Sequence, residues 1–383
     1  MFETQEEIKK SRHGKMQGSI GELTSIKTGK LDANASVANG RYPFFTCSKE
    51  TLTIDSYSYD CECVLVAGNG DLNVKYYNGK FDAYQRTYII EDASDGKLYM
   101  KYLYWFMSSY INELRKQAIG GVIKYIKLGN LTGAKIQLPS IKKQMEIVNI
   151  ITKVNNVLCY RESQLHKLDE LIQARFVEMF GDLMFNQYNW PLVKIADISA
   201  FLKSGLSRKL SDVDIGLPVI RSGNIQNGQF IYGDVKYWYK EDPKGAKTEE
   251  YVLEDGDILI NFINSVSQIG KTAVYRDVGR KCIYTTNIFR MKLNDNCNEC
   301  YYNWFAMSDY YYRQLQNIIQ PAVNQASFTT VNFLKLNIPL PPIELQNQFA
   351  DFVNQVNKSK VEIQQALEKT QLLFDSLMQQ YFG

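Results

Sequence analysis

The sequence predicts an α+β protein built from two copies of one unit, each a strand-rich mixed domain followed by a long helix. Three observations lead to this fold class. The segment from Leu138 to Gly181 occurs again 202 residues later, from Leu340 to Gly383. The apolar residues of both segments repeat with a helical period. The regions before them contain short β-rich runs between glycine, asparagine and aspartate turns.

The repeat is recognised by a motif that both segments share. Each begins with Leu-Pro, has an isoleucine three residues after the leucine and a glutamine six residues after it, and ends in Phe-Gly. The match extends upstream, where "YPFF" pairs with "LPVI" at an offset of 175 and "YLYWF" with "YYNWF" at an offset of 199. The second copy therefore carries an insertion of about 25 residues, which we place within residues 221–270.

Both repeated segments are predicted to be helices of about 38 residues, or about 57 Å at about 1.5 Å per residue. The Leu-Pro is typical of a helix start, and Gly181 and Gly383 of helix ends. Spacings of three and four residues indicate that the helices pair as an antiparallel coiled coil with an internal pseudo-twofold repeat. The predicted seam consists of Ile147, Ile151, Val154, Leu158, Leu165, Leu168, Ile172, Val353, Val356, Ile363, Leu367, Phe374 and Leu377. Arg161, Arg175, Lys360 and Thr370 occupy the remaining seam positions.

The domains before the helices are predicted to mix strands and helices. We expect strands in "CVLVAG", "RTYIIED", "YVLEDGDILIN" and "NIFRMKL". Helices are expected in "YLYWFMSSYINELRKQ" and "YYNWFAMSDYYYRQLQNII", with Trp105 and Trp304 as core residues. The predicted domains are 1–137, the helical region 138–181, a second domain 182–337 and a C-terminal helical region 338–383.

Composition excludes several classes of protein. Hydrophobic residues make up 45% of the 383 residues, enough for packed cores, but no run is long and apolar enough to span a membrane. The N-terminus lacks a signal-peptide pattern and the 7 cysteines are scattered, so we expect a cytoplasmic protein without disulfides. The net charge of +3 does not indicate a nucleic-acid partner and does not exclude one.

No catalytic constellation is found in the sequence. The two histidines are His13 and His166, and the second is expected on a solvated helix face. Neither Asn-Pro-Pro-Tyr nor Asp-Pro-Pro-Tyr occurs, so the base-methylation motif is absent. Gly270-Lys-Thr lacks the earlier glycine of a phosphate-binding loop, because that position is Ser265. Cys297 and Cys300 have zinc-ligand spacing but no second pair of ligands nearby, so we expect no metal site. Taken together, these motifs lead us to expect no catalytic residue in the chain.

Binding remains, and polar and basic residues gather in the predicted loops of both domains. Lysine and arginine neutralise phosphates, while arginine, asparagine and glutamine hydrogen-bond base edges. Each residue alone is most simply a solvated surface residue. The candidates for DNA contact are Lys27, Lys30, Arg41, Lys75, Tyr76, Tyr77, Lys80, Gln85, Arg86, Lys124 and Lys127 in the first domain, and Lys203, Arg208, Lys209, Arg221, Asn224, Asn264, Lys271, Thr286, Asn287, Asn324 and Gln325 in the second.

The duplicated unit, with its Leu-Pro-x-Ile-x-x-Gln motif and long helix, resembles the specificity subunit of type I restriction-modification systems. The resemblance covers about residues 16–383. "NWPLVKIADISAFLKSG" also looks like the opening of a target-recognition domain, whereas the first copy, "GKMQGSIGELTSIKTG", lacks the tryptophan. The resemblance implies that the two divergent domains read a split target on double-stranded DNA and that the helices hold them apart.

The resemblance also implies partners for this chain. Two methyltransferase subunits would dock on the helices and bring S-adenosylmethionine, and restriction subunits would add ATP- and Mg-dependent translocation and cleavage for phage defence. The chain itself would carry no cofactor and no enzymatic activity. The alternative is an interaction scaffold of the same shape, in a related anti-phage assembly, that does not read DNA.

Overall fold

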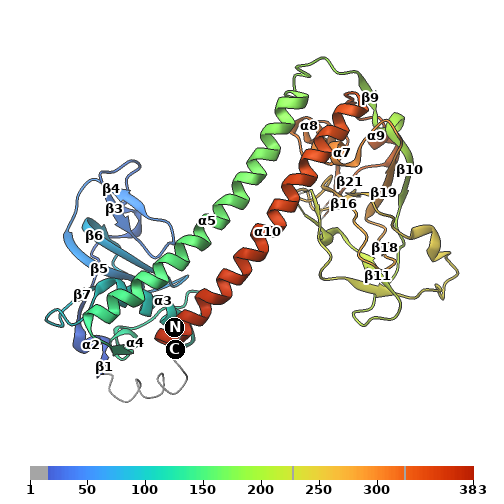
Figure 1. Ribbon diagram of the computed structural model, residues 1–383. Coiled ribbons are helices and arrows are strands. Elements are labelled where there is room, and N and C mark those ends of the chain that lie inside the picture. The colour runs from blue at the N-terminus through green and yellow to red at the C-terminus, as the bar shows by residue number, and fades with distance from the viewer. Residues whose placement is uncertain (1–15, 227, 323–324) are drawn as a thin grey trace. The chain divides into compact units, whose positions relative to one another are not determined.

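The computed structural model describes residues 16–226, 228–322 and 325–383 (Figure 1). The chain divides into two compact units. Unit 1 comprises Met1–Ser163 and Ile363–Gly383, and unit 2 comprises Gln164–Glu362. Two helices of 40 residues each, α5 (Ile141–Phe180) and α10 (Ile343–Phe382), contribute one half to each unit. The predicted long helices are therefore present.

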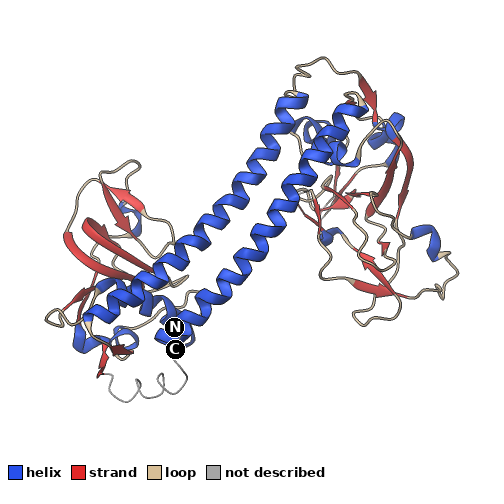
Figure 2. Cartoon of the chain, viewed as in Figure 1, coloured by secondary structure: helices blue, strands red, loops and turns tan. Residues whose placement is uncertain are grey.

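Unit 1 is organised around a six-stranded sheet in the order β2-β7-β5-β6-β3-β4. Its strands are among the red arrows on the left of Figure 2. All neighbours are antiparallel except β3 and β6, which are parallel. The short strands β1 and β8 pair separately. The strands are β1 (Met16–Ser19), β2 (Thr24–Thr28), β3 (Tyr42–Phe45), β4 (Leu52–Ile54), β5 (Tyr59–Ala67), β6 (Val74–Ala83), β7 (Thr87–Asp92) and β8 (Lys135–Leu138). The helices are α2 (Ile20–Leu23), the 3-10 turn η2 (Ala33–Ala35), α3 (Met100–Gln117) and α4 (Leu128–Thr132).

The core of unit 1 lies between the sheet and α3. Residues 63–67 of β5 are all buried, which explains why this stretch is continuously apolar rather than alternating. On α3, Leu103, Phe106 and Met107 are buried in the same apolar cluster as Val64 of β5. Trp105 is 8% exposed, as predicted for a core residue.

Unit 2 repeats this strand order in two pieces. The order β10-β19-β15-β17 corresponds to β2-β7-β5-β6, and β14-β11-β18 corresponds to β4-β3-β6, again with one parallel pair. The first strands are β9 (Leu192–Lys194), β10 (Ser199–Ser204), β11 (Leu217–Ile220), β12 (Ile225–Gln226), β13 (Gln229–Phe230), β14 (Lys236–Trp238) and β15 (Ile258–Asn261). They are followed by β16 (Ile263–Asn264), β17 (Thr272–Val274), β18 (Ile283–Tyr284), β19 (Ile288–Leu293), β20 (Gln320–Pro321), β21 (Ala326–Ser327) and β22 (Asn337–Pro339). The helical elements are α6 (Ile195–Ile198), η3 (Ser222–Asn224), η4 (Thr248–Tyr251), α7 (Glu299–Phe305), α8 (Asp309–Gln316) and α9 (Thr330–Leu334).

Three local predictions differ from the structure. The stretch 301–319 forms two helices, α7 and α8, because Ser308 caps a new helix by accepting a hydrogen bond from the Tyr311 amide at 3.3 Å. In "YVLEDGDILIN" only Ile258–Asn261 forms a strand, since a turn precedes it. The Leu-Pro motifs lie before the long helices rather than in their first turns, and Leu138 ends strand β8.

A few side-chain contacts join the two long helices within each unit. In unit 1, Arg161 of α5 donates hydrogen bonds to the Ala366 carbonyl and the Thr370 hydroxyl of α10, while the Phe374 ring of α10 packs on the Trp105 ring of α3 with centroids 5.8 Å apart. In unit 2, the Phe176 and Phe349 rings are 5.4 Å apart, and Lys360 pairs with Asp169 at 2.6 Å. All thirteen predicted seam residues are buried or half-buried. The seam as a coiled-coil interface stays a prediction.

A buried glutamine fixes the start of each long helix. The Gln144 amide accepts a hydrogen bond from the Tyr99 backbone N–H at 2.8 Å and donates to the carbonyls of Lys97 and Pro139, both at 2.8 Å. Tyr99 is the N-cap residue of α3, so the amide joins the first turns of α3 and α5.

Gln346 makes the same three bonds in unit 2. Its amide accepts from the Asn298 N–H at 2.8 Å and donates to the carbonyls of Asn296 and Pro341 at 3.2 and 2.8 Å. Both glutamines are 0% exposed, and we call each set of three bonds the amide clamp. The shared glutamine of the repeat is thus a structural residue.

The amide clamp gives the first prediction. Gln144→Ala removes the partner of one N–H and two carbonyls in a partly buried site, so we expect a loss of about 1 to 3 kcal/mol in unfolding free energy. Gln346→Ala should act similarly in unit 2. Gln137→Ala is the matched control, because Gln137 is exposed on β8. Urea unfolding measures the effect, and equal stability of the Gln144 and Gln137 variants would contradict the clamp.

Candidate nucleic-acid interface

A cleft of about 570 Å³ opens between segments of unit 2. It is lined by residues 206–208 after β10, by residues 221–224 and Gln226 after β11, by residues 285–287 between β18 and β19, and by Ile231 and Asp234. Five residues predicted to bind DNA line this second-domain cleft: Arg208, Arg221, Asn224, Thr286 and Asn287. The structure therefore brings together residues that are up to 79 positions apart in the sequence.

Arg208 is held in one orientation by a carboxylate. Its Nε donates to Asp242 Oδ2 at 3.0 Å, a second guanidinium nitrogen binds the same carboxylate, and a third donates to the Ser207 carbonyl at 2.8 Å. The Asp242 side chain is 0% exposed and also accepts from two backbone N–H groups, of Lys244 and Ala246. The hydrogen bonds from Arg208 hold the pKa of the Asp242 carboxyl well below its usual range.

Asn224 lies in the wall of the cleft with its amide already bonded within the protein. Its side chain is buried, its Oδ1 accepts from the Arg221 N–H at 2.8 Å, and its Nδ2 donates to the Ile231 carbonyl at 2.9 Å. These bonds shape the loop, and DNA contact by Asn224 stays a prediction. Arg221 itself reaches Asp234, donating to its carbonyl at 2.7 Å and its carboxylate at 2.8 Å, with its side chain 29% exposed.

Thr286 and Asn287 are polar residues of the cleft whose side chains are not hydrogen-bonded to the residues that the structure describes. Both are half-buried and line it, and within the described part of the chain neither side chain makes a hydrogen bond. Their backbone is fixed by neighbours: the Thr285 N–H donates to the Ile220 carbonyl, and the Phe262 N–H donates to the Asn287 carbonyl. A hydroxyl and an amide on a rigid turn are suited to hydrogen-bonding a base edge.

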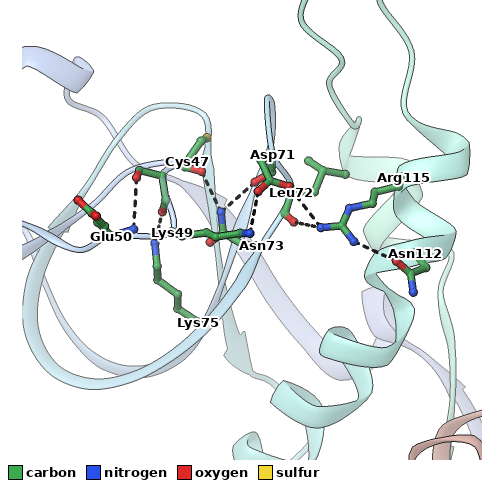
Figure 3. Close-up of polar contacts among 10 residues, drawn as sticks. Cys47, Lys49, Glu50, Asp71, Leu72, Asn73, Lys75, Asn112 and Arg115 are labelled. Atoms are coloured by element: carbon green, nitrogen blue, oxygen red, sulfur yellow. Dashed lines mark hydrogen bonds and ion pairs between the residues drawn. The ribbon is translucent and has the colours of Figure 1, made fainter. Parts of the chain in front are cut away.

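In unit 1, the loop after β3 and the β5–β6 loop are tied together by a polar network (Figure 3). Asn73 Nδ2 donates to the Cys47 carbonyl at 2.8 Å, and Asp71 pairs with Lys49 at 3.2 Å and with Arg115 of α3 at 3.3 Å. Lys75 donates to the Ser48 carbonyl. This first-domain loop network joins residues 46–51, residues 68–73 and α3.

Lys75, on strand β6, already has a protein partner. Its ammonium group is bound to the Ser48 carbonyl, its side chain is half-buried, and burial lowers its pKa. It joins β6 to the loop after β3 (Figure 3), and DNA contact by Lys75 stays a prediction. Lys49, which the sequence analysis missed, is exposed in the same network and could have been noticed as a lysine in the polar run "TCSKE".

The other residues predicted to contact DNA differ in exposure and in protein partners. Some already have protein partners: Lys27 with Glu91, Lys203 with Glu250, Tyr76 with Glu62, Tyr77 with the Lys80 carbonyl, Arg41 with the Asp55 carbonyl, and Asn264 with the Ser265 N–H. Exposed are Lys30, Lys80, Gln85, Arg86, Lys124, Lys127, Lys209 and Gln325, whereas Lys271 is half-buried. Asn324 lies outside the described residues.

Two backbone bonds bring the unit 1 loops to one edge. The Gly68 N–H donates to the Arg86 carbonyl at 2.8 Å, and the Gly70 N–H donates to the Lys124 carbonyl at 2.9 Å. The exposed side chains of Arg86 and Lys124 therefore belong to connected loops.

The described residues show no arrangement of metal ligands. No group of three or more His, Cys, Asp or Glu side chains that could hold a metal occurs in 16–226, 228–322 and 325–383. Burial raises the pKa of the Cys300 thiol to about 12, which keeps it protonated near neutral pH. Gly270-Lys-Thr leads into strand β17 rather than a helix, unlike a phosphate-binding loop. No helix among the described residues is long and apolar enough to cross a membrane.

Comparison with known proteins identifies the family. The model of the type I restriction modification DNA specificity domain matches residues 14–168 and again 188–372. The chain belongs to this family. Its two matched regions coincide with the two copies of the repeat. Specificity subunits are the non-catalytic, DNA-recognition subunits of type I complexes.

Individual relatives resemble different parts of the chain. The type I restriction enzyme EcoDI specificity subunit of Escherichia coli is 40% identical over 154 residues, which are 40% of this chain and 33% of the relative. The chain thus matches about a third of that relative's length. The MjaVIII specificity subunit of Methanocaldococcus jannaschii is 22% identical over 70% of this chain and 68% of the relative.

Solved structures share the fold of the whole chain. The S subunit of a type I restriction-modification system from M. genitalium superposes with a TM-score of 0.63 at 16% identity, covering 97% of this chain and 96% of that one. At this identity the likeness concerns the fold alone.

The Arg208–Asp242 pair predicts a pH dependence of stability. Because the folded pKa of Asp242 is depressed, its stabilisation is present above about pH 4, the ordinary aspartate range, and is lost as the pH falls below it. Asp242→Asn should lower the melting temperature at neutral pH, and the gap to wild type should narrow below about pH 4. Glu241→Gln, an exposed neighbour, is the control. A gap that stays constant to pH 3 would refute the assignment.

Proposed function

We propose that this chain is the DNA-specificity subunit of a type I restriction-modification complex and that each of its two domains reads one half of a split target. The observation that carries the proposal is the pairing of one repeated scaffold with two different sets of loops. The strand order recurs in units 1 and 2, whereas residues 221–257 between β11 and β15 replace the shorter 46–58 of the first copy. Loops on a fixed scaffold are where recognition is usually found.

The long helices would set the distance between the two readers. We propose that α5 and α10 form an antiparallel coiled coil with a pseudo-twofold axis, so that the domains meet DNA in opposite orientations. The pairs Arg161 with Thr370 and Asp169 with Lys360 support this, because the partner on α10 moves toward its N-terminus as the residue on α5 moves toward its C-terminus. A 40-residue helix is about 60 Å long, which corresponds to more than one turn of DNA.

Partner subunits would supply the chemistry. Two methyltransferase subunits would dock around the helices and bind S-adenosylmethionine, and restriction subunits would bind ATP and Mg. The chain would itself neither methylate nor cut, since its sequence has no base-methylation motif.

The alternative is a scaffold for a related assembly that does not read DNA, which the net charge of +3 leaves open. Binding of duplex DNA by the complete complex at increasing salt concentration distinguishes the two. A DNA reader should lose affinity steeply, because phosphate contacts release counterions. Salt-independent or undetectable DNA binding would favour the scaffold.

Domain exchange tests whether specificity is modular. Replacing residues 190–337 with the equivalent domain of a relative should change one half of the methylated sequence and leave the other half and the spacing intact. Methylome sequencing of cells that express the exchanged chain with its methyltransferase reads both halves. A change in both half-sites would contradict independent readers.

Helix length should determine spacing. Four residues inserted after Ser163 and four after Glu362 lengthen both helices by about 6 Å, or about two base pairs. Four residues also stay close to the 3.5-residue repeat of the seam. The methylated motif should gain spacer positions but keep its specified bases. Inserting four residues in the exposed loop after Gln187 serves as the control and should leave the spacer unchanged. Altered bases with an unaltered spacer would reject the ruler.

A further inference from the structure

A tight hairpin in unit 1, Ile119–Tyr125, projects apolar residues from its turn. Its ends are joined by two reciprocal backbone hydrogen bonds, from the Ile119 N–H to the Tyr125 carbonyl at 3.0 Å and from the Tyr125 N–H to the Ile119 carbonyl at 2.8 Å. Gly120 has φ +121°, and a Cβ there would lie 2.6 Å from the Ile123 carbonyl oxygen. The turn therefore requires glycine at position 120.

Two adjacent aliphatic side chains in this turn, Val122 and Ile123, are exposed and do not pack in the core. Val122 is 105% exposed and Ile123 is 63% exposed. Scattered exposed hydrophobic residues are ordinary. A neighbouring pair at the turn of a hydrogen-bonded hairpin forms an apolar tip, and a partner that covers it removes apolar surface from water, which is favourable.

The hairpin is anchored on the loops of the candidate interface. The Gly70 N–H donates to the Lys124 carbonyl at 2.9 Å, the Ile126 N–H donates to the Gly68 carbonyl at 2.9 Å, and the Tyr88 hydroxyl donates to the Ile126 carbonyl at 3.2 Å. The apolar tip is thus fixed relative to the β5–β6 loop.

Three basic residues lie in the hairpin or in segments next to it. Lys124 lies in the hairpin, Lys127 follows it, and Arg86 lies in the loop bonded to Gly68. All three are exposed, and none forms an ion pair within residues 16–226, 228–322 and 325–383. The nearby Asp71 carboxylate is already paired with Lys49 and Arg115. The edge therefore offers unneutralised positive charge around an apolar centre.

We propose that this hairpin is a DNA-reading element of the first domain, with Val122 and Ile123 against the bases and Lys124, Lys127 and Arg86 on the flanking phosphates. Duplex DNA matches this pattern, because anionic phosphates border grooves that contain apolar surface, such as the thymine methyl group or an opened base step. The inference rests on the proposed function and extends it by assigning base contact to side chains that cannot hydrogen-bond. Sequence reasoning that sought polar residues overlooked them.

The test uses the complete complex and a duplex that carries its methylated motif. Val122→Asp should weaken binding of this duplex about tenfold or more, because it replaces an apolar contact with a negative charge near phosphates. Val122→Ala should weaken it less. Val331→Asp is the matched control, since Val331 is 63% exposed on α9, and it should bind as wild type does. Equal melting temperatures establish that the variants are folded.

Crosslinking identifies what the tip touches. With p-benzoylphenylalanine at position 122, irradiation should link the chain to DNA within one half-site, and the same group at position 331 should give no DNA adduct. A crosslink to another subunit instead of DNA, or unchanged affinity of Val122→Asp, would overturn the hairpin assignment while leaving the proposed function intact. Failure of the wild-type complex to bind the duplex would reject the proposed function as well.

Discussion

The buried glutamine amide at the start of each long helix is the interaction on which the architecture depends. Gln144 and Gln346 each bind one N–H and two carbonyls that would otherwise lack a protein partner in a partly buried site. Because the N–H belongs to the N-cap residue of α3 or α7, the amide joins a domain helix and a long helix at one point. In the function that we propose, this joint would let helix length set the spacing on DNA.

Rigidity also extends to the loops that we assign to recognition. Asp242 holds Arg208, Asn224 shapes the wall of the second-domain cleft, and the network around Asp71 ties two loops to α3 (Figure 3). Ordering these loops in advance reduces the conformational entropy that would be lost on binding. The residues left for a ligand are those without internal partners, such as Asn287 in the cleft and the basic residues beside the 119–125 hairpin.

Sequence reasoning was most accurate where the signal is local and periodic. The long helices, β5, β7 and β19 follow from apolar patterns, and they occur where those patterns predicted them. It failed at Ala306–Ser308, where a side-chain cap divides one apolar pattern into two helices. Among site residues it could not separate Lys75 from an exposed lysine, because the Ser48 carbonyl that binds it lies on a different loop.

The sequence by itself determined the duplication, the length of the helices and the shared glutamine, because each is written in consecutive residues at a fixed offset. Only the tertiary structure decided which polar residues remain available to a ligand. Hydrogen-bond partners such as Arg208 and Asp242 are far apart in the sequence, and the arrangement of the strands brings them together. The same holds for Val122, whose exposure depends on a hairpin anchored to Gly68 and Gly70 rather than on its own residue type.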